Sequence, residues 1–183
     1  MTRPSWHSRG YLPHCDEDGL VQHVVFRLAD SLPAAALAKM ELLDKIQRFA
    51  RCDKLLDAGV GSALFRSPAA AQIVVDALLW FDDQRYALVA WCVMPNHVHA
   101  VIEPRGEHAL SQIIKSWKAF TAANINKFLG RSGRLWAPDY FDRFMRSNEH
   151  LATTIDYVER NPVAAKLCAA PADWPYSSAA LRG

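Results

Sequence analysis

Long hydrophobic runs are missing from this 183-residue sequence. The longest apolar stretch is broken by Pro95 and Asn96, and nothing approaches the roughly 20 apolar residues that a helix needs to cross a bilayer. The first ten residues contain Arg3 and Arg9, but no apolar segment follows them, which argues against a signal peptide. We therefore expect a cytoplasmic protein that does not enter the membrane.

Paired cysteines and internal repeats are missing as well. The four cysteines lie far apart and form no CxxC pair, which argues against a zinc ribbon or a redox motif and favours reduced thiols. No low-complexity tract or long linker divides the chain. We therefore predict one domain over residues 1–183, in which residues 1–20 form an N-terminal arm.

A large excess of either charge is also missing, since the net charge is only +2. The distribution is less even, because residues 105–166 hold ten Lys and Arg against six Asp and Glu. A basic sector of this kind suits the phosphate backbone of a nucleic acid, but it equally suits an ordinary solvated surface. Charge alone leaves both interpretations open.

Hydrophobic patterning predicts the secondary structure. Short β-branched and aromatic runs predict strands at residues 22–28, 86–94, 97–103 and 140–146. The nearly continuous apolar run at 86–94 is typical of a buried central strand. Helical periodicity covers residues 34–51, 68–83, 110–129 and 148–160. Asn161-Pro162 marks the expected end of the last helix, and the glycine-containing segment 56–66 could hold a short strand.

This order of elements predicts an α+β fold. It matches the βαββαβ plan of a ferredoxin-like antiparallel sheet, followed by a C-terminal helix. In that plan the helices cover one face of the sheet and leave the other face available. A functional site would therefore be expected on the uncovered face.

His97 and His99 are separated by one residue in the predicted strand 97–103. Side chains alternate along a strand, so both imidazoles point to one face, and two neutral ring nitrogens can reach one divalent cation. The alternative is a pair of hydrogen-bonded histidines without a metal. A histidine-triad hydrolase is excluded, because Val101 stands where its third histidine would be needed.

Tyr157 and Asn161 lie four residues apart in the last predicted helix, so they share one face if the helix persists. A tyrosine can act as a nucleophile when a metal polarises its target. The amide oxygen of Asn161 can complete a mixed nitrogen and oxygen coordination sphere suited to Mg²⁺ or Mn²⁺. Considered alone, Tyr157 fits a packed tyrosine better than a nucleophile.

Several longer motifs occur together in this chain. They are WCVMPNHVHAVIE, WAPDYFDRFMRS, and IDYVERNPVAAKL followed by DWPYSS. In combination they resemble the REP-associated tyrosine transposases, a branch of the HUH single-strand nucleases. The segments YLPHCDEDG, VVFRLADSLP and LLDAGVGSALFR resemble the same branch, so the resemblance extends from Tyr11 to Ser178.

The resemblance implies a metal-dependent, single-strand DNA endonuclease and strand transferase with a ferredoxin-like core. It implies that His97-Val98-His99 is the HUH motif, that Asn161 helps to hold the metal, and that Tyr157 forms a 5′-phosphotyrosine intermediate. The implied cofactor is Mg²⁺ or Mn²⁺, and the implied partner is single-stranded DNA whose palindromic repeats form hairpins, in the nucleoid. A monomer and a homodimer are both compatible with this family.

Basic and aromatic side chains provide candidate DNA contacts. Lys115, Lys118, Arg131, Arg134, Arg143 and Arg146 are candidates for phosphate contacts, Trp136 and Tyr140 for stacking on unpaired bases, and Arg9 and His14 for reading a guide sequence. Each aromatic residue could equally belong to the core.

Two other functions stay open. A catalytically silent regulator would bind DNA hairpins without cutting them, although a pure binder has no need of His97, His99 and Tyr157 together. A small metallo-hydrolase unrelated to DNA would leave the basic sector and Tyr157 unexplained.

Overall fold

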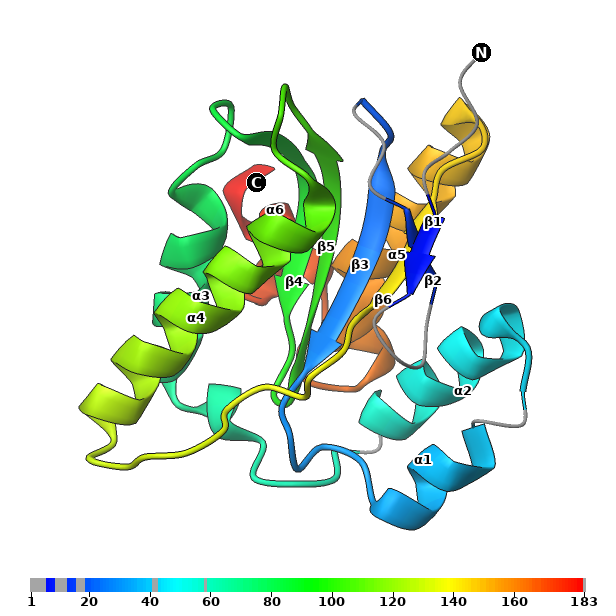
Figure 1. Ribbon diagram of the computed structural model, residues 1–183. Helices are drawn as coiled ribbons and strands as arrows, with labels where there is room; N and C mark the ends of the chain where they lie inside the picture. Colours follow the sequence, from blue (N-terminus) through cyan, green and yellow to red (C-terminus); the bar gives the residue numbers. More distant parts are fainter. Residues whose placement is uncertain (1–5, 9–12, 16–18, 41–42, 58, 183) are drawn as a thin grey trace.

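The computed structural model describes every residue except 1–5, 9–12, 16–18, 41–42, 58 and 183. Its main sheet consists of β3 (Gln22–Arg27), β4 (Tyr86–Val93), β5 (His97–Pro104) and β6 (Phe141–Phe144). Neighbouring strands pair antiparallel in the order β4-β5-β3-β6. This is the strand order of a ferredoxin-like sheet, so the predicted α+β fold is confirmed (Figure 1).

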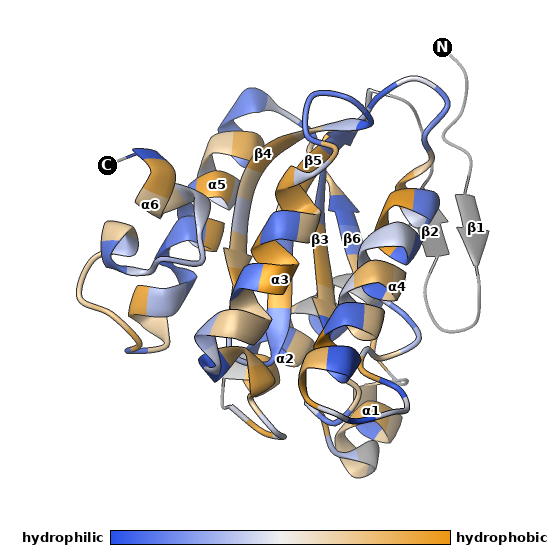
Figure 2. Cartoon of the chain, turned by 90° about the vertical axis from the view of Figure 1, so that its left-hand side faces the viewer, coloured by the Kyte–Doolittle hydropathy of each residue, from blue (hydrophilic) through white to orange (hydrophobic). Residues whose placement is uncertain are grey.

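The main core lies between one face of the sheet and two helices, α3 (Pro68–Leu79) and α4 (Leu110–Phe128). Phe26 of β3 and Val98 of β5 are buried in this layer. Figure 2 shows α3 hydrophobic along most of its length, whereas α4 alternates between hydrophobic and hydrophilic residues. Because Val98 points into this core, the residues on either side of it must point to the opposite face.

That opposite face is not left open, and this part of the fold prediction was wrong. The helix α5 (Asn148–Ala164) packs against β4 and β5, and α2 (Lys45–Asp57) approaches β3 and β5. The physical reason is that much of this face is also apolar. Val25 packs with Leu56 of α2, and Ala90 packs with Val158 of α5.

The strand β4 lies at the edge of the sheet and is not the central strand that its apolar run predicts. The C-terminal segment covers the outer edge, where the Val93 N–H donates to the Tyr176 carbonyl oxygen (2.8 Å) and the Trp91 N–H donates to Ser178 Oγ (3.1 Å). Helices on both faces bury its side chains, which explains the continuous apolar run.

Three predicted boundaries differ from the structure. The expected helix 34–51 is two helices, α1 (Ala34–Met40) and α2, and Asp44 caps the second by accepting the Gln47 N–H (2.9 Å). The described part of 56–66 forms no strand and ends in the 3₁₀ turn η1 (Leu64–Arg66). The helix α5 continues through Pro162 to Ala164, since a buried proline in the last turn removes only one backbone donor.

The remaining elements are short. In the N-terminal arm, β1 (Trp6–Ser8) and β2 (Pro13–Cys15) pair antiparallel, and the C-terminal region holds η2 (Pro171–Asp173) and α6 (Ser178–Arg182). Across the described ranges, no helix combines the length and apolar composition required to span a membrane.

The loop between α2 and η1 depends on Gly61. Its φ is +93°, and a Cβ atom at this position would lie 2.6 Å from the carbonyl oxygen of Asp30. The same contact is reinforced by the Ser62 N–H, which donates to Asp30 Oδ2 (2.9 Å). Gly59 also has a positive φ of +72°, but a Cβ there would meet nothing within 4 Å.

We predict that Gly61→Ala lowers the melting temperature more than Gly59→Ala. Both substitutions place a side chain at positive φ, which costs about 1–2 kcal/mol, but only Gly61→Ala adds a clash with backbone. Thermal unfolding followed by circular dichroism would compare the two variants with the wild type. Equal losses would show that the approach to Asp30 does not constrain the loop.

Candidate active site

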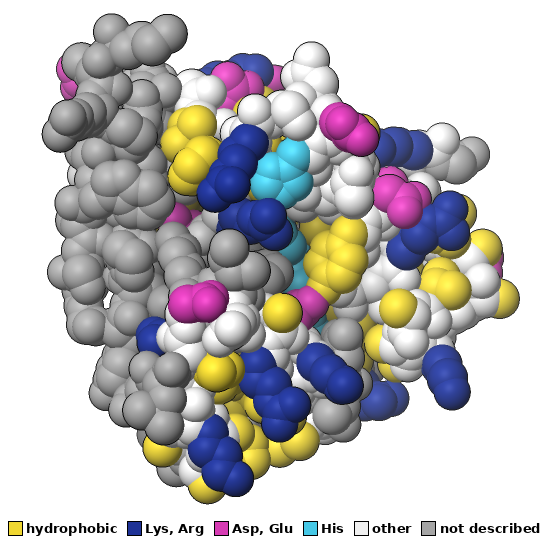
Figure 3. All heavy atoms as spheres, turned by 90° about the vertical axis from the view of Figure 1, so that its right-hand side faces the viewer, with side chains coloured by type: hydrophobic (Ala, Val, Ile, Leu, Met, Phe, Trp, Pro, Cys, Tyr) yellow, Lys and Arg dark blue, Asp and Glu magenta, His cyan; other side chains and the backbone are white. Residues whose placement is uncertain are grey.

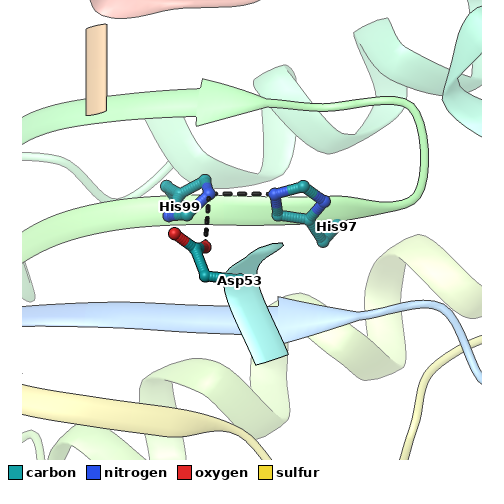
Figure 4. Close-up of side chains that lie close together, drawn as sticks. All are labelled: Asp53, His97 and His99. Atoms are coloured by element: carbon teal, nitrogen blue, oxygen red, sulfur yellow. Dashed lines mark hydrogen bonds and ion pairs between the residues drawn. The ribbon is translucent and has the colours of Figure 1, made fainter. Parts of the chain in front are cut away.

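His97 and His99 point to the same face of β5, as the alternation predicted. Both rings are fully buried, with 0% of their surface exposed. Their Nε2 atoms are 2.9 Å apart, and the ring planes are tilted by 76° (Figure 4). Two imidazole nitrogens this close together can be ligands of one cation.

Asn96 fixes the orientation of the His97 ring. Its Nδ2 donates to the carbonyl oxygens of Leu56 (3.1 Å) and Val60 (3.0 Å), so its Oδ1 must be the acceptor for His97 Nδ1 (2.7 Å). His97 therefore carries its hydrogen on Nδ1 and presents Nε2 without one. The segment 56–66 supplies both of these carbonyl oxygens, so its role is to hold the Asn96 amide in place. Its glycines alone did not predict this role.

Asp53 is a third member of the cluster, and the sequence analysis missed it. Its Oδ1 lies 3.6 Å from His99 Nε2, and donor atoms of Asp53, His97 and His99 all lie within 4.8 Å of one another. Asp53 belongs to α2, which approaches the histidines only through the tertiary fold (Figure 4). Asp53 is more than forty residues from His97 in the sequence, so no spacing pattern predicts that the two lie together. The only signal in the sequence is that a carboxylate is a suitable metal ligand.

Asn161 reaches the same point from α5. Its Nδ2 lies 3.3 Å from His99 Nε2, and its buried Oδ1 has no hydrogen-bond partner within the described parts of the chain. A buried acceptor without a partner is costly, and a cation would satisfy it. Two imidazole nitrogens, a carboxylate and an amide oxygen form a donor set that fits a divalent cation such as Mg²⁺ or Mn²⁺.

Tyr157 lies one helical turn before Asn161. Its ring packs edge-on against His99, with centroids 5.9 Å apart and planes at 85°, while 38% of its surface stays exposed. The helix is held in place by Ser147, whose Oγ accepts the His150 N–H at the N-terminus, and by buried Val158. A phenol is thus placed beside the donor cluster and within reach of solvent.

Burial sets the protonation of the histidines. It lowers the pKa of His97 to about 3. Burial, with a smaller contribution from a neighbouring histidine, also lowers the pKa of His99 and that of His23 well below 6.5. All three rings are therefore neutral at pH 7, which is the form of imidazole that coordinates metals.

Two of the predicted DNA contacts lie near this site. Arg143 is exposed on β6 directly opposite His23, and Arg146 follows the same strand. Both are close enough to His150 to lower its pKa, after the larger effect of partial burial. Figure 3 shows dark blue basic side chains beside histidine and hydrophobic surfaces around a hollow on this side of the molecule.

The other basic candidates lie away from the donor cluster. Lys115, Lys118 and Arg134 line a separate hollow of about 480 Å³ between α4 and the 133–140 segment. Lys118 is engaged there, since its Nζ donates to the carbonyl oxygens of Ala137, Pro138 and Asp139, and burial lowers its pKa to about 8. Arg131 is exposed after α4.

The two aromatic candidates are buried. Trp136 packs against Phe26 and Phe65 and donates its Nε1 hydrogen to Thr121 Oγ1 (2.8 Å), and Tyr140 belongs to the same core. The core alternative therefore describes both residues, and neither offers a free ring face to a base. Arg9 lies outside the described residues, and only the backbone of His14, in β2, is described.

Comparison with known proteins identifies the relatives of this chain. Residues 77–161 match the family model described as Transposase IS200 like. The matched stretch contains His97, His99, Tyr157 and Asn161. Over these residues the chain is similar to the IS200-like transposases.

Two individual relatives agree with this. A curated Haemophilus influenzae protein named as a REP-associated tyrosine transposase is 26% identical over 106 residues, which make up 51% of this chain and 58% of that protein. The match thus spans little more than half of that relative. A solved REP-associated tyrosine transposase bound to a REP hairpin has a TM-score of 0.58 and 18% identity, covering 95% of this chain and 82% of that one. That likeness concerns the fold, and the predicted resemblance is confirmed.

We predict that the metal-free protein loses stability as the pH falls below about 6.5. The pKa values of the buried histidines in the folded protein lie below the unfolded value of 6.5. Between pH 6.5 and each folded pKa, the unfolded chain therefore binds more protons than the folded protein. Stability is therefore fully present above pH 6.5 and decreases with falling pH, by up to about 1.4 kcal/mol per pH unit for each histidine. Urea unfolding in EDTA across this range, with His97→Gln for comparison, would measure it; an unchanged slope in the variant would contradict the account.

We also predict that Asp53→Asn weakens Mn²⁺ binding by about tenfold or more, because it removes the only anionic group of the described cluster. Isothermal titration calorimetry would measure the dissociation constant. Asp156→Asn is the matched control, since this exposed carboxylate on α5 pairs with Arg160 (2.6 Å). Equal Mn²⁺ affinity in both variants would remove Asp53 from the site.

Proposed function

We propose that this chain is a metal-dependent endonuclease and strand transferase that acts on single-stranded, hairpin-forming DNA. One observation carries the proposal: the exposed Tyr157 packs against His99, on which three further donor groups converge. A nucleophile beside such a cluster suits metal-assisted attack on a phosphodiester. The relation to the IS200-like transposases supports DNA as the substrate.

In the proposed reaction, the phenolic oxygen of Tyr157 attacks the scissile phosphorus. The new bond joins this oxygen to phosphorus, and the bond from phosphorus to the 3′ oxygen breaks. The phenol loses one proton, and the departing 3′ oxygen gains one. The protein then holds a 5′-phosphotyrosine, and because its bond energy is retained, a 3′-hydroxyl can reverse the step and join strands without ATP.

A divalent cation bound to His97, His99, Asn161 and Asp53 would supply Lewis-acid stabilisation of the charge on the phosphate. The residues of the chain hold the geometry. Asn96 presents His97 Nε2, and α5 carries both Tyr157 and Asn161, so one rigid helix aligns the nucleophile with a ligand. Asp53 extends the predicted ligand set by an anionic oxygen, which suits the hard cations Mg²⁺ and Mn²⁺.

Arg143 and Arg146 are the proposed phosphate contacts, since they lie on the side of the sheet where the donor cluster is found. The solved structure of the same fold is described as bound to a REP hairpin, which supports hairpin DNA as the partner. We place this activity in the cytoplasm, on DNA of the nucleoid.

One observation favours a second function, that of a regulator which binds hairpins without cutting. His97 and His99 are fully buried and Asp53 of α2 lies against His99, so in this arrangement neither ring is open to a phosphate. A protein in which α2 stayed in place would bind DNA through its basic surface and leave the strand intact.

We predict that the protein forms a covalent adduct with labelled single-stranded DNA that carries palindromes from beside its own gene, in the presence of Mg²⁺ or Mn²⁺. Denaturing electrophoresis would detect the adduct. Tyr157→Phe should abolish it and leave hairpin binding nearly unchanged, because only the hydroxyl is lost. Replacing His97 and His99 with Ala should abolish it together with the metal dependence.

Tyr176→Phe is the matched control, since this tyrosine packs beside Trp174 in the C-terminal segment and away from His99. If Tyr157→Phe still forms the adduct, Tyr157 is not the nucleophile. Tight hairpin binding by the wild type without an adduct in either metal would favour the regulator.

A further inference from the structure

A third histidine, His23, lies directly behind the donor cluster. It belongs to β3 and is almost fully buried. Its Nε2 is 3.1 Å from Nδ1 of His99, and the two rings stack with centroids 5.3 Å apart. The ring of Tyr157 meets it edge-on at 6.1 Å. His23 therefore contacts both the ligand at the centre of the site and the proposed nucleophile.

The direction of each hydrogen bond in this chain of rings follows from Asn96. Since His97 carries its hydrogen on Nδ1, its Nε2 can only accept. Without a cation between the rings, the 2.9 Å contact between the two Nε2 atoms requires a hydrogen on His99 Nε2, so the Asn161 amide nitrogen 3.3 Å away does not donate to this atom. His99 Nδ1 is then an acceptor, so His23 Nε2 must donate to it.

A cation held by both Nε2 atoms requires the reverse arrangement. A coordinating nitrogen carries no hydrogen, so the hydrogen of neutral His99 moves to Nδ1. His99 Nδ1 then donates, and His23 Nε2 must accept, with its own hydrogen on Nδ1. The bond between His23 and His99 thus reverses its direction, and no proton is gained or lost by the set.

We propose that His23 is a positioning residue for the cation: it donates to His99 in the empty site, accepts from it in the loaded site, and keeps His99 Nε2 aimed at the metal. The inference rests on the proposed function only in that a cation binds His97 and His99. Imidazole suits this position because one atom can serve either as donor or as acceptor, whereas a carboxylate only accepts and an ammonium only donates.

The contact with Tyr157 adds a consequence for the reaction. His23, His99 and Tyr157 pack ring against ring. Removing the His23 ring would leave a gap beside both partners, so the ligand and the nucleophile would lose the same support. A partner that orients a metal ligand is typically worth 10–100-fold in metal affinity.

The test compares His23→Leu and His23→Gln by Mn²⁺ titration, in which electron paramagnetic resonance reports the free ion. His23→Leu should weaken Mn²⁺ binding by about 10–100-fold, because leucine can neither donate nor accept. His23→Gln should bind close to the wild type, because its amide reaches the position of Nε2 and can turn to present either group. His108→Leu, at an exposed histidine before α4, is the control.

A spectroscopic measurement separates positioning from simple loss of packing. Nitrogen-15 NMR of labelled histidines should show, on addition of Mg²⁺, that His99 Nδ1 gains a hydrogen while His23 Nε2 loses one. If His23→Leu binds Mn²⁺ as tightly as the wild type, or if Mg²⁺ leaves the nitrogen signals unchanged, the inference about His23 is wrong. The proposed function would be unaffected by either result. Failure of the wild type to bind Mn²⁺ would overturn the proposed function with it.

Discussion

Buried imidazoles and amides must find their hydrogen-bond partners inside the protein, and this constraint organises the whole site. The partners come from separate elements: the carbonyl oxygens of Leu56 and Val60 hold Asn96, Asn96 holds His97, and His99 meets groups from β3, α2 and α5. Each element must therefore be in place for the rings to be satisfied. In the proposed function a cation would complete the network, because it would replace the hydrogen bond between the two Nε2 atoms and satisfy the unpartnered oxygen of Asn161.

The two faces of the sheet have different roles. One face packs with α3 and α4 into the main core, around Phe26, Val98 and Trp136, and gives the strands a rigid base. The other face holds the histidines between two elements with different roles. α5 carries the proposed nucleophile Tyr157 and the proposed ligand Asn161, and α2 places the Asp53 carboxylate against His99. In the proposed function, α2 therefore supplies one ligand and also helps to bury the histidines.

Local patterns predicted much of this from the sequence. Alternation placed His97 and His99 on one face, and helical spacing placed Tyr157 and Asn161 together, because both relations involve residues close in the chain. The strand order also followed from the order of elements. Asp53, Asn96 and His23 were not found as parts of the site, since their roles exist only through contacts between distant elements. Burial was equally hard to predict: the base-stacking candidates Trp136 and Tyr140 are core residues, and Lys118 is held by backbone carbonyls, because one sequence does not show which face of a segment meets a neighbour.

The most direct test of the central claim is anomalous diffraction from crystals of the protein grown with Mn²⁺. The account predicts one strong anomalous peak at bonding distance from Nε2 of both His97 and His99, with oxygens of Asp53 and Asn161 in the same coordination shell. A peak elsewhere, or an empty position between two histidines that remain hydrogen-bonded to each other at saturating Mn²⁺, would contradict it.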